Sequence, residues 1–265
     1  MKKDGRNLNF ILGCVICAVM IILIITGFFY TPYGPDTMNG PDKFAAPSFR
    51  HLMGADQFGR DIFSRVLKGL GTTGWISLVT VVIGGLTGTL VGALTGYYGG
   101  ILDEILMRIN DIVTAFPSFL LALVFISVLG PGRGNLIMAL SIAFIPSFAR
   151  VVRGEFILYR ERDYVKSAKL WGASGVRIMF VHILPNALPV ILSSAAIGFN
   201  NAVLAEASLS YLGIGVQPPD ASLGRMISEA STYLFSAPWC AVFPGVMIIL
   251  LILGFGMISD GLKRR

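Results

Sequence analysis

The segment YVKSAKLWGASGVRIMFVHILPN, residues 164–186, decides how the rest of this chain is interpreted. It carries Lys166 and Lys169 in a chain that is otherwise rich in apolar residues. Because charged side chains are costly inside a bilayer, we predict that this segment lies outside the membrane. Tyr164 to Trp171 can form one short helix, and Gly172 is placed to end it.

The residues alone leave two roles open for this short helix. Its small side chains, Ala168 among them, allow close approach, so the helix fits as a plug for a socket in a cytoplasmic partner. It fits equally well as an amphipathic helix that rests on lipid headgroups. The side of the membrane on which it lies is therefore the first question.

Composition places most of the chain in lipid. The chain has 265 residues, 54% hydrophobic and 14% charged, with a mean hydropathy of +0.74. An ordinary soluble domain is about 25% charged. The formal net charge of +6 could suggest a nucleic-acid partner. In a membrane protein, however, basic residues gather in cytoplasmic loops, and no base-reading motif is present, so we expect no nucleic acid.

Charge-free runs predict an all-α membrane protein with six transmembrane helices, since about 20 apolar residues cross the hydrocarbon. The runs are Leu8–Thr31, a span within Gly69–Leu102, Ile112–Gly132, Gly134–Ala149, a span within Ile178–Ala205 and a span within Ala230–Ser259. The fourth run is short, and we expect its helix to continue past Arg150. The first is longer than the core of a signal peptide, so we expect residues 1–31 to be a tail and a retained helix.

Six spans place both termini on one side, and the excess of Lys and Arg on that side predicts that it is the cytoplasm. Residues 150–184 then form a cytoplasmic loop within a five-helix core, 69–265. Residues 32–68 and 206–235 lie outside.

The first external segment carries two acid–base pairs at a spacing of four residues. These are Asp56 with Arg60 and Asp61 with Arg65. Such spacing predicts two ion pairs on an interfacial helix.

A glycine recurs every fourth residue in the second span, at Gly84, Gly88, Gly92 and Gly96. One face of that helix therefore lacks side chains, which predicts close packing against another helix.

Motifs for catalysis and metal binding are missing from the sequence. There is no G-x-x-x-x-G-K-[ST] phosphate loop, so any ATP and Mg²⁺ are expected on partner subunits and the chain is not expected to be an enzyme. Cys14 and Cys17 lie in an apolar run and are interpreted as packing residues. His51 and His182 are far apart and are interpreted as structural. An ion-coupled secondary transporter remains an alternative, although no pair of intramembrane carboxylates supports it.

Three segments resemble signatures of ABC importer permeases. Residues 164–186 resemble the E-A-A-x-x-x-G loop, which is followed ten residues on by I-x-L-P; here Lys166 and Ser167 stand for the Glu and the first Ala, and His182 replaces the Ile. MGADQFGRDIFSRVLKG, residues 53–69, resembles GTDxxGRDxxSRxxxG. EASLSYLGIGVQPPDASLGRMI, residues 206–227, resembles ExxLSFLGxGxxPPxPxWG. The external signature residues are Asp56, Gly59, Arg60, Asp61, Arg65, Glu206, Gly213, Pro218 and Pro219.

The order and spacing of these segments are similar to those of the second, C-type permease of dipeptide, oligopeptide and nickel importers. The resemblance implies a multi-pass type I permease in the bacterial plasma (inner) membrane that forms half of a pathway for peptides, with nickel or a nickel chelate as an alternative cargo. It implies four partners besides the lipid bilayer: a homologous second permease, two ATP-binding subunits and an extracytoplasmic substrate-binding protein. It assigns contact with the ATPase to Asp163, Tyr164, Lys166, Ser167, Ala168, Lys169, Trp171, Gly172 and Ala173.

Overall fold

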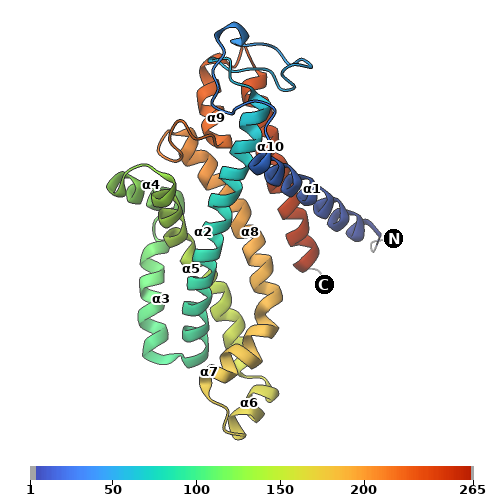
Figure 1. Ribbon diagram of the computed structural model, residues 1–265. Helices are drawn as coiled ribbons and strands as arrows, with labels where there is room; N and C mark the ends of the chain where they lie inside the picture. The colour runs from blue at the N-terminus through green and yellow to red at the C-terminus, as the bar shows by residue number, and fades with distance from the viewer. Residues whose placement is uncertain (1–3, 264–265) are drawn as a thin grey trace.

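The computed structural model describes residues 4–263 and shows a long helical bundle (Figure 1). Residues 1–3 and 264–265, at the two termini that we expect in the cytoplasm, lie outside the described residues. No strand occurs between residues 4 and 263. The helices are α1 Asp4–Phe29, α2 Ile62–Tyr98, α3 Gly100–Thr114, α4 Ser118–Leu129, α5 Arg133–Arg160, α6 Asp163–Leu170, α7 Gly175–Arg177, α8 Leu184–Tyr211, α9 Leu223–Ala230 and α10 Trp239–Lys263. Two 3₁₀ turns, Gly40–Asp42 and Ser231–Tyr233, and a π-helical turn, Ile178–Ile183, complete the list.

Five helices are long and apolar enough to cross a membrane, and α3 with α4 makes a sixth span that is bent by 85°. The expected third run, 112–132, corresponds to this bent pair, which begins earlier, at Gly100. Pro117 stands between α3 and α4 with an extended ψ of 128°. A proline disfavours the helical conformation of the residue before it, here Phe116, which explains the break. In contrast, α5 runs past Arg150, as expected.

The glycine face of α2 packs directly on α5. A Cβ added at Gly88 would lie 2.6 Å from the Phe148 Cβ, and one added at Gly96 would lie 2.6 Å from the Phe156 Cβ. At Gly92 it would lie 2.5 Å from the Ala149 carbonyl oxygen. The two backbones approach so closely that no side chain fits between them.

α1 and α10 lean away from the bundle and pack on each other (Figure 1). A Cβ added at Gly254 of α10 would lie 2.8 Å from the Cys17 sulfur of α1. Cys17 is buried and Cys14 is exposed, and both are free thiols. Cys17 therefore contributes to a helix crossing.

The first external segment differs from its prediction. It contains one 3₁₀ turn before α2 and no interfacial helix in the described chain. The predicted ion pair between Asp61 and Arg65 is absent: Asp61 caps α2 by accepting a hydrogen bond of 2.8 Å from the Ser64 amide. An aspartate just before a helix is favoured in that role, and it determines where this side chain points. The Asp56–Arg60 pair is present at 2.6 Å, in a turn.

The connections between spans are also shorter than predicted. α5 extends to Arg160 and α8 to Tyr211. The expected loops, 150–184 and 206–235, each therefore begin with residues that are helical. Figure 1 places α6 and α7 at one end of the bundle and the external segment with α9 at the other.

Candidate functional site

The short helix α6 packs on the end of the bundle mainly through one buried apolar side chain, Val165. Val165 is fully buried in a cluster with Phe156 of α5 and with Ile178 and Met179 of the following turns. Ala168 and Ala173 pack against the same cluster. Their small size lets the backbone of α6 lie close to the ends of α5 and α8.

The opposite side of α6 presents large apolar side chains to its surroundings. Leu170 is 89% exposed and Trp171 is 90% exposed. Burial and the nearby Tyr159 raise the pKa of the Tyr164 phenol. Asp163, Lys166 and Ser167 are also exposed. Leu170 and Trp171 are adjacent in the sequence and both expose most of their side chains at the end of α6.

Gly172 ends α6 in the conformation that the sequence suggested. Its φ is +78°, in the left-handed region that favours glycine. The Gly172 amide donates to the Lys169 carbonyl and the Ala173 amide donates to the Ala168 carbonyl, both at 3.0 Å. These two bonds define a Schellman turn, which places Trp171 at the tip of the helix.

α6 also touches the last turns of α2. The Lys169 ammonium nitrogen lies 5.3 Å from the centroid of the Tyr97 ring. The Arg160 guanidinium, just before α6, donates to the Gly96 carbonyl at 3.1 Å. Nearby, Arg153 of α5 and Asp103 of α3 form a two-bonded ion pair at 2.6 Å. A displacement of α6 would therefore reach α2, α5 and α8 together.

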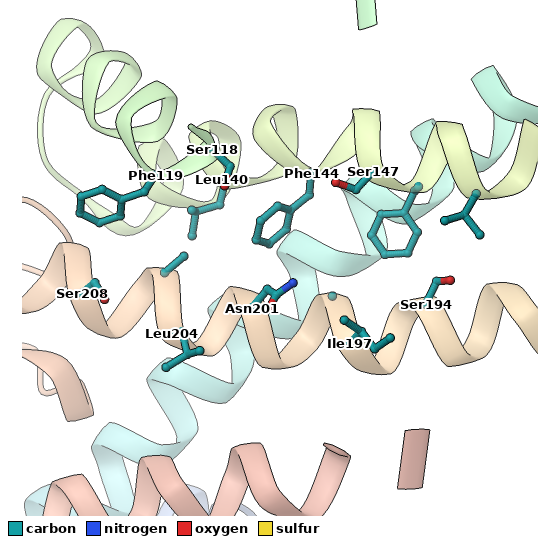
Figure 2. Close-up of a pocket in the computed structure, with 14 residues that line it drawn as sticks. Ser118, Phe119, Leu140, Phe144, Ser147, Ser194, Ile197, Asn201, Leu204 and Ser208 are labelled. Carbon is teal, nitrogen blue, oxygen red and sulfur yellow. The ribbon is translucent and has the colours of Figure 1, made fainter. Parts of the chain in front are cut away.

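A cavity of about 570 Å³ lies among α4, α5 and α8, away from α6 along the bundle. Figure 2 shows Phe144 of α5 and Asn201 of α8 facing each other across it. The described residues that line it include three phenylalanines and four serines, and none is Asp, Glu, Lys, Arg, His or Cys. The cavity is therefore amphipathic and uncharged.

The α8 side of the cavity is a stripe that the sequence analysis missed. Its members are Ser194, Gly198, Asn201, Ala205 and Ser208. They are spaced four and three residues apart in alternation, which keeps them on one helix face. A heptad of small or polar residues within an apolar span was the signal that could have revealed this face.

Three of the external signature residues meet in a buried ionic cluster. Arg60 binds Asp56 at 2.6 Å and Glu229 of α9 at 2.9 Å. Arg65, almost fully buried, binds Glu229 at 3.3 Å and Asp36 at 3.1 Å. The cluster fastens the external segment to α9, and sequence reasoning did not identify Glu229.

Asp61 and Gly59 belong to the turn that carries this cluster. Asp61 contacts His51 Nδ1 at 2.9 Å. Gly59 has a φ of +72°, and a Cβ there would collide with the Asn39 carbonyl. Both residues shape the external segment and neither joins the ion pairs of Arg60 and Arg65.

Glu206 is a fully buried residue of α8. Its Oε1 accepts a hydrogen bond of 2.7 Å from the Ser210 hydroxyl, which in turn accepts from the Val216 amide at 3.1 Å. Gly213, with a φ of +80°, and the cis Pro218–Pro219 bond lie in the loop that follows. Through Ser210, Glu206 thus holds the start of the loop between α8 and α9 in place.

Residues 88–265 match the family described as "Binding-protein-dependent transport system inner membrane component".

The chain belongs to this family.

The permease is similar to curated relatives along nearly its whole length. It is 39% identical to the dipeptide transport system permease protein DppC of Alkalihalophilus pseudofirmus over 262 residues, covering 99% of this chain and 86% of the relative. It is 35% identical to DppC of Haemophilus influenzae, covering 97% and 90%. It is 40% identical to the glutathione transport system permease protein GsiD of an Escherichia coli strain, covering 92% and 82%.

A solved structure supports the fold. A chain of the MetNI methionine ABC transporter, in a structure of its inward-facing conformations, matches with a TM-score of 0.61 and 20% identity. The match covers 75% of this permease and 94% of that chain. The predicted fold class, an all-α membrane protein of the type I ABC importer permease kind, is confirmed.

Proposed function

We propose that this permease forms half of the translocation pathway of an ATP-driven importer of dipeptides and oligopeptides. The observation that carries the proposal is the pairing of an uncharged cavity among α4, α5 and α8 with the exposed tip of α6 at the end of the bundle. The peptide assignment is supported by the relatives, which are named as dipeptide, peptide and glutathione permeases.

The lining of the cavity favours peptides over nickel. Hydroxyl and amide groups of Ser147, Ser194 and Asn201 can bond to a peptide backbone, and the phenylalanines can contact side chains of many kinds. Nickel prefers imidazole, thiolate or carboxylate ligands, which the described lining lacks. A homologous second permease would complete the pathway on the open side.

In this proposal, α6 is the coupling helix, and it lies in the cytoplasm with both termini. The basic residues around it, Arg162, Lys166, Lys169 and Arg177, agree with that orientation. Two ATP-binding subunits hold ATP and Mg²⁺ and receive Leu170 and Trp171. Their closure displaces α6, and the contacts of Val165 pass the motion to the helices that line the cavity. An external binding protein delivers the peptide.

Reconstitution tests this function. The assembled complex in proteoliposomes should import a labelled dipeptide only when ATP is inside and the binding protein is outside. The isolated permease should import none. Uptake by the isolated permease, driven by an ion gradient, would contradict the proposal and support a secondary transporter.

A further inference from the structure

A second cavity of about 390 Å³ opens between the end of α1 and the beginnings of α2 and α5. It shares no lining residue with the pathway cavity. The external segment connects α1 to α2, and α5 starts directly after the turn that follows α4. The cavity therefore lies toward the end of the bundle opposite α6 (Figure 1).

The close crossing of α1 and α2 shapes this cavity. A Cβ added at Gly27 would lie 2.6 Å from the Leu67 carbonyl oxygen, and one added at Gly71 would lie 3.5 Å from the Phe28 ring. α1 leans away from the bundle (Figure 1). The residues that line the cavity come from α1, from α2 and from the first turns of α5.

The walls of the cavity suit a lipid. Phe28 is 63% exposed and Trp75 is 59% exposed, and Ile137 lines the α5 side. The apolar span of α1 ends at Phe29, so Phe28 lies at the end of that span. Tryptophans such as Trp75 are enriched where the hydrocarbon meets the headgroups.

Two cations lie at the same cavity. Lys68 is exposed, and within residues 4–263 no carboxylate pairs with it. Arg133, the first residue of α5, binds Asp220 at 2.8 Å. No described lining residue is acidic. Every phospholipid carries a phosphate that Lys68 and Arg133 could contact, but the ammonium of a zwitterionic headgroup would lie beside these cations with no unpaired carboxylate among the described lining residues.

We propose that this cavity binds an anionic phospholipid, which lies in the outer leaflet in the orientation given under the proposed function, on which this placement rests. Its phosphate lies between Lys68 and Arg133, and one acyl chain runs along Phe28, Trp75 and Ile137. Basic pockets between transmembrane helices on the cytoplasmic side of membranes bind anionic headgroups. This cavity offers the same kind of charge beside an apolar wall. The lipid fills the space between α1 and α5 and so supports the angle at which α1 leaves the bundle.

Native mass spectrometry of the assembled transporter tests the charge. The complex is delipidated and offered equal amounts of phosphatidylglycerol and phosphatidylethanolamine. We expect it to retain phosphatidylglycerol preferentially, and Lys68→Ala to lower that retention about fivefold. Lys43→Ala removes the same charge from the external segment, outside the cavity, and should change nothing. Unchanged retention in Lys68→Ala, or equal retention of the two lipids, would overturn the proposal.

Photocrosslinking tests the occupant. A benzophenone amino acid is placed at position 75 of the assembled complex in membranes. We expect an adduct whose mass is that of a phospholipid. Crosslinking to the second permease or another protein instead of lipid would show that a subunit covers the cavity, and the lipid site would be rejected.

Discussion

The Lys169 ammonium nitrogen of α6 lies 5.3 Å from the centroid of the Tyr97 ring, in the last turns of α2. Helix α6 thus contacts the same helix whose glycine face packs along α5. Because those backbones are in direct contact, we expect α2 and α5 to move as one body. In the proposed function, the contact between Lys169 and Tyr97 is one of the points at which a force on α6 would reach that body.

The contact itself can be measured by a double-mutant cycle. A cation–π pair contributes about 0.5–1 kcal/mol at an exposed site. Lys169→Ala and Tyr97→Leu should each lower uptake per ATP hydrolysed about two- to fivefold, and together no more than either alone. Additive losses would indicate that the two side chains act independently.

The exposed tip of α6 should determine binding of the ATPase. Buried tryptophans in interfaces often cost 2 kcal/mol or more when truncated, which corresponds to about a thirtyfold loss of affinity. We expect Trp171→Ala to lose co-purifying ATPase subunits. Phe235→Ala is the control, because Phe235 is equally exposed near the opposite end. Equal losses in both variants would contradict an ATPase contact at Trp171.

Gly172 should be required because its backbone adopts a left-handed conformation that other residues disfavour. Nothing lies within 4 Å of a Cβ added there, but its φ of +78° penalises other residues by about 1–2 kcal/mol. Gly172→Ala should therefore weaken coupling while leaving expression and membrane insertion unchanged. Gly154→Ala is the matched control, since that glycine also has open space but no positive φ. Uptake per ATP should fall only in the first variant.

Because α2 packs tightly on α5, alanine should destabilise the complex at Gly88 but not at Gly85, three residues away. A Cβ at Gly88 would lie 2.6 Å from the Phe148 Cβ, whereas one at Gly85 would meet that ring at an ordinary 3.6 Å. Gly88→Ala should lower the melting temperature of the complex by several degrees, because overpacking costs about 1–3 kcal/mol. Gly85→Ala should leave it unchanged, and the reverse order would refute this packing.

The described lining of the cavity among α4, α5 and α8 is uncharged, so adding a charge there should make uptake depend on the charge of the substrate. Asn201→Asp keeps the size of the side chain and adds a negative charge opposite Phe144. We expect uptake of acidic dipeptides to fall about tenfold relative to neutral ones, since like charges repel strongly where water is scarce. Uptake of a neutral dipeptide by the same variant is the internal control. Equal uptake of both would remove Asn201 from the pathway.

Much of the bundle could be predicted from the sequence, because apolar runs and glycine spacing act locally. The spans, the position of α6 and the Gly172 turn all follow from residues near one another in the chain. Pro117 indicates a kink in the third span, but the sequence alone does not distinguish a kinked helix from the break of 85° that the structure shows.

The site was less predictable where distant residues meet. Glu229 gains its role only because α9 folds over the turn that holds Arg60 and Arg65. Asp61 was paired with the wrong cation because capping competes with i,i+4 pairing and depends on where the helix starts. Asn201 of α8 could not be recognised as a cavity residue because the other walls of that cavity come from α4 and α5.

The central claim is that the tip of α6 docks on a separate ATPase in the cytoplasm. Leu170→Cys, in a background with Cys14 replaced by Ser, provides one reactive thiol at that tip, since Cys17 and Cys240 are buried. In the assembled complex we expect this thiol to crosslink to an ATP-binding subunit, with a yield that changes when ATP is added. Labelling of the thiol by a membrane-impermeant reagent from the outer side, or crosslinking only to lipid, would contradict the claim.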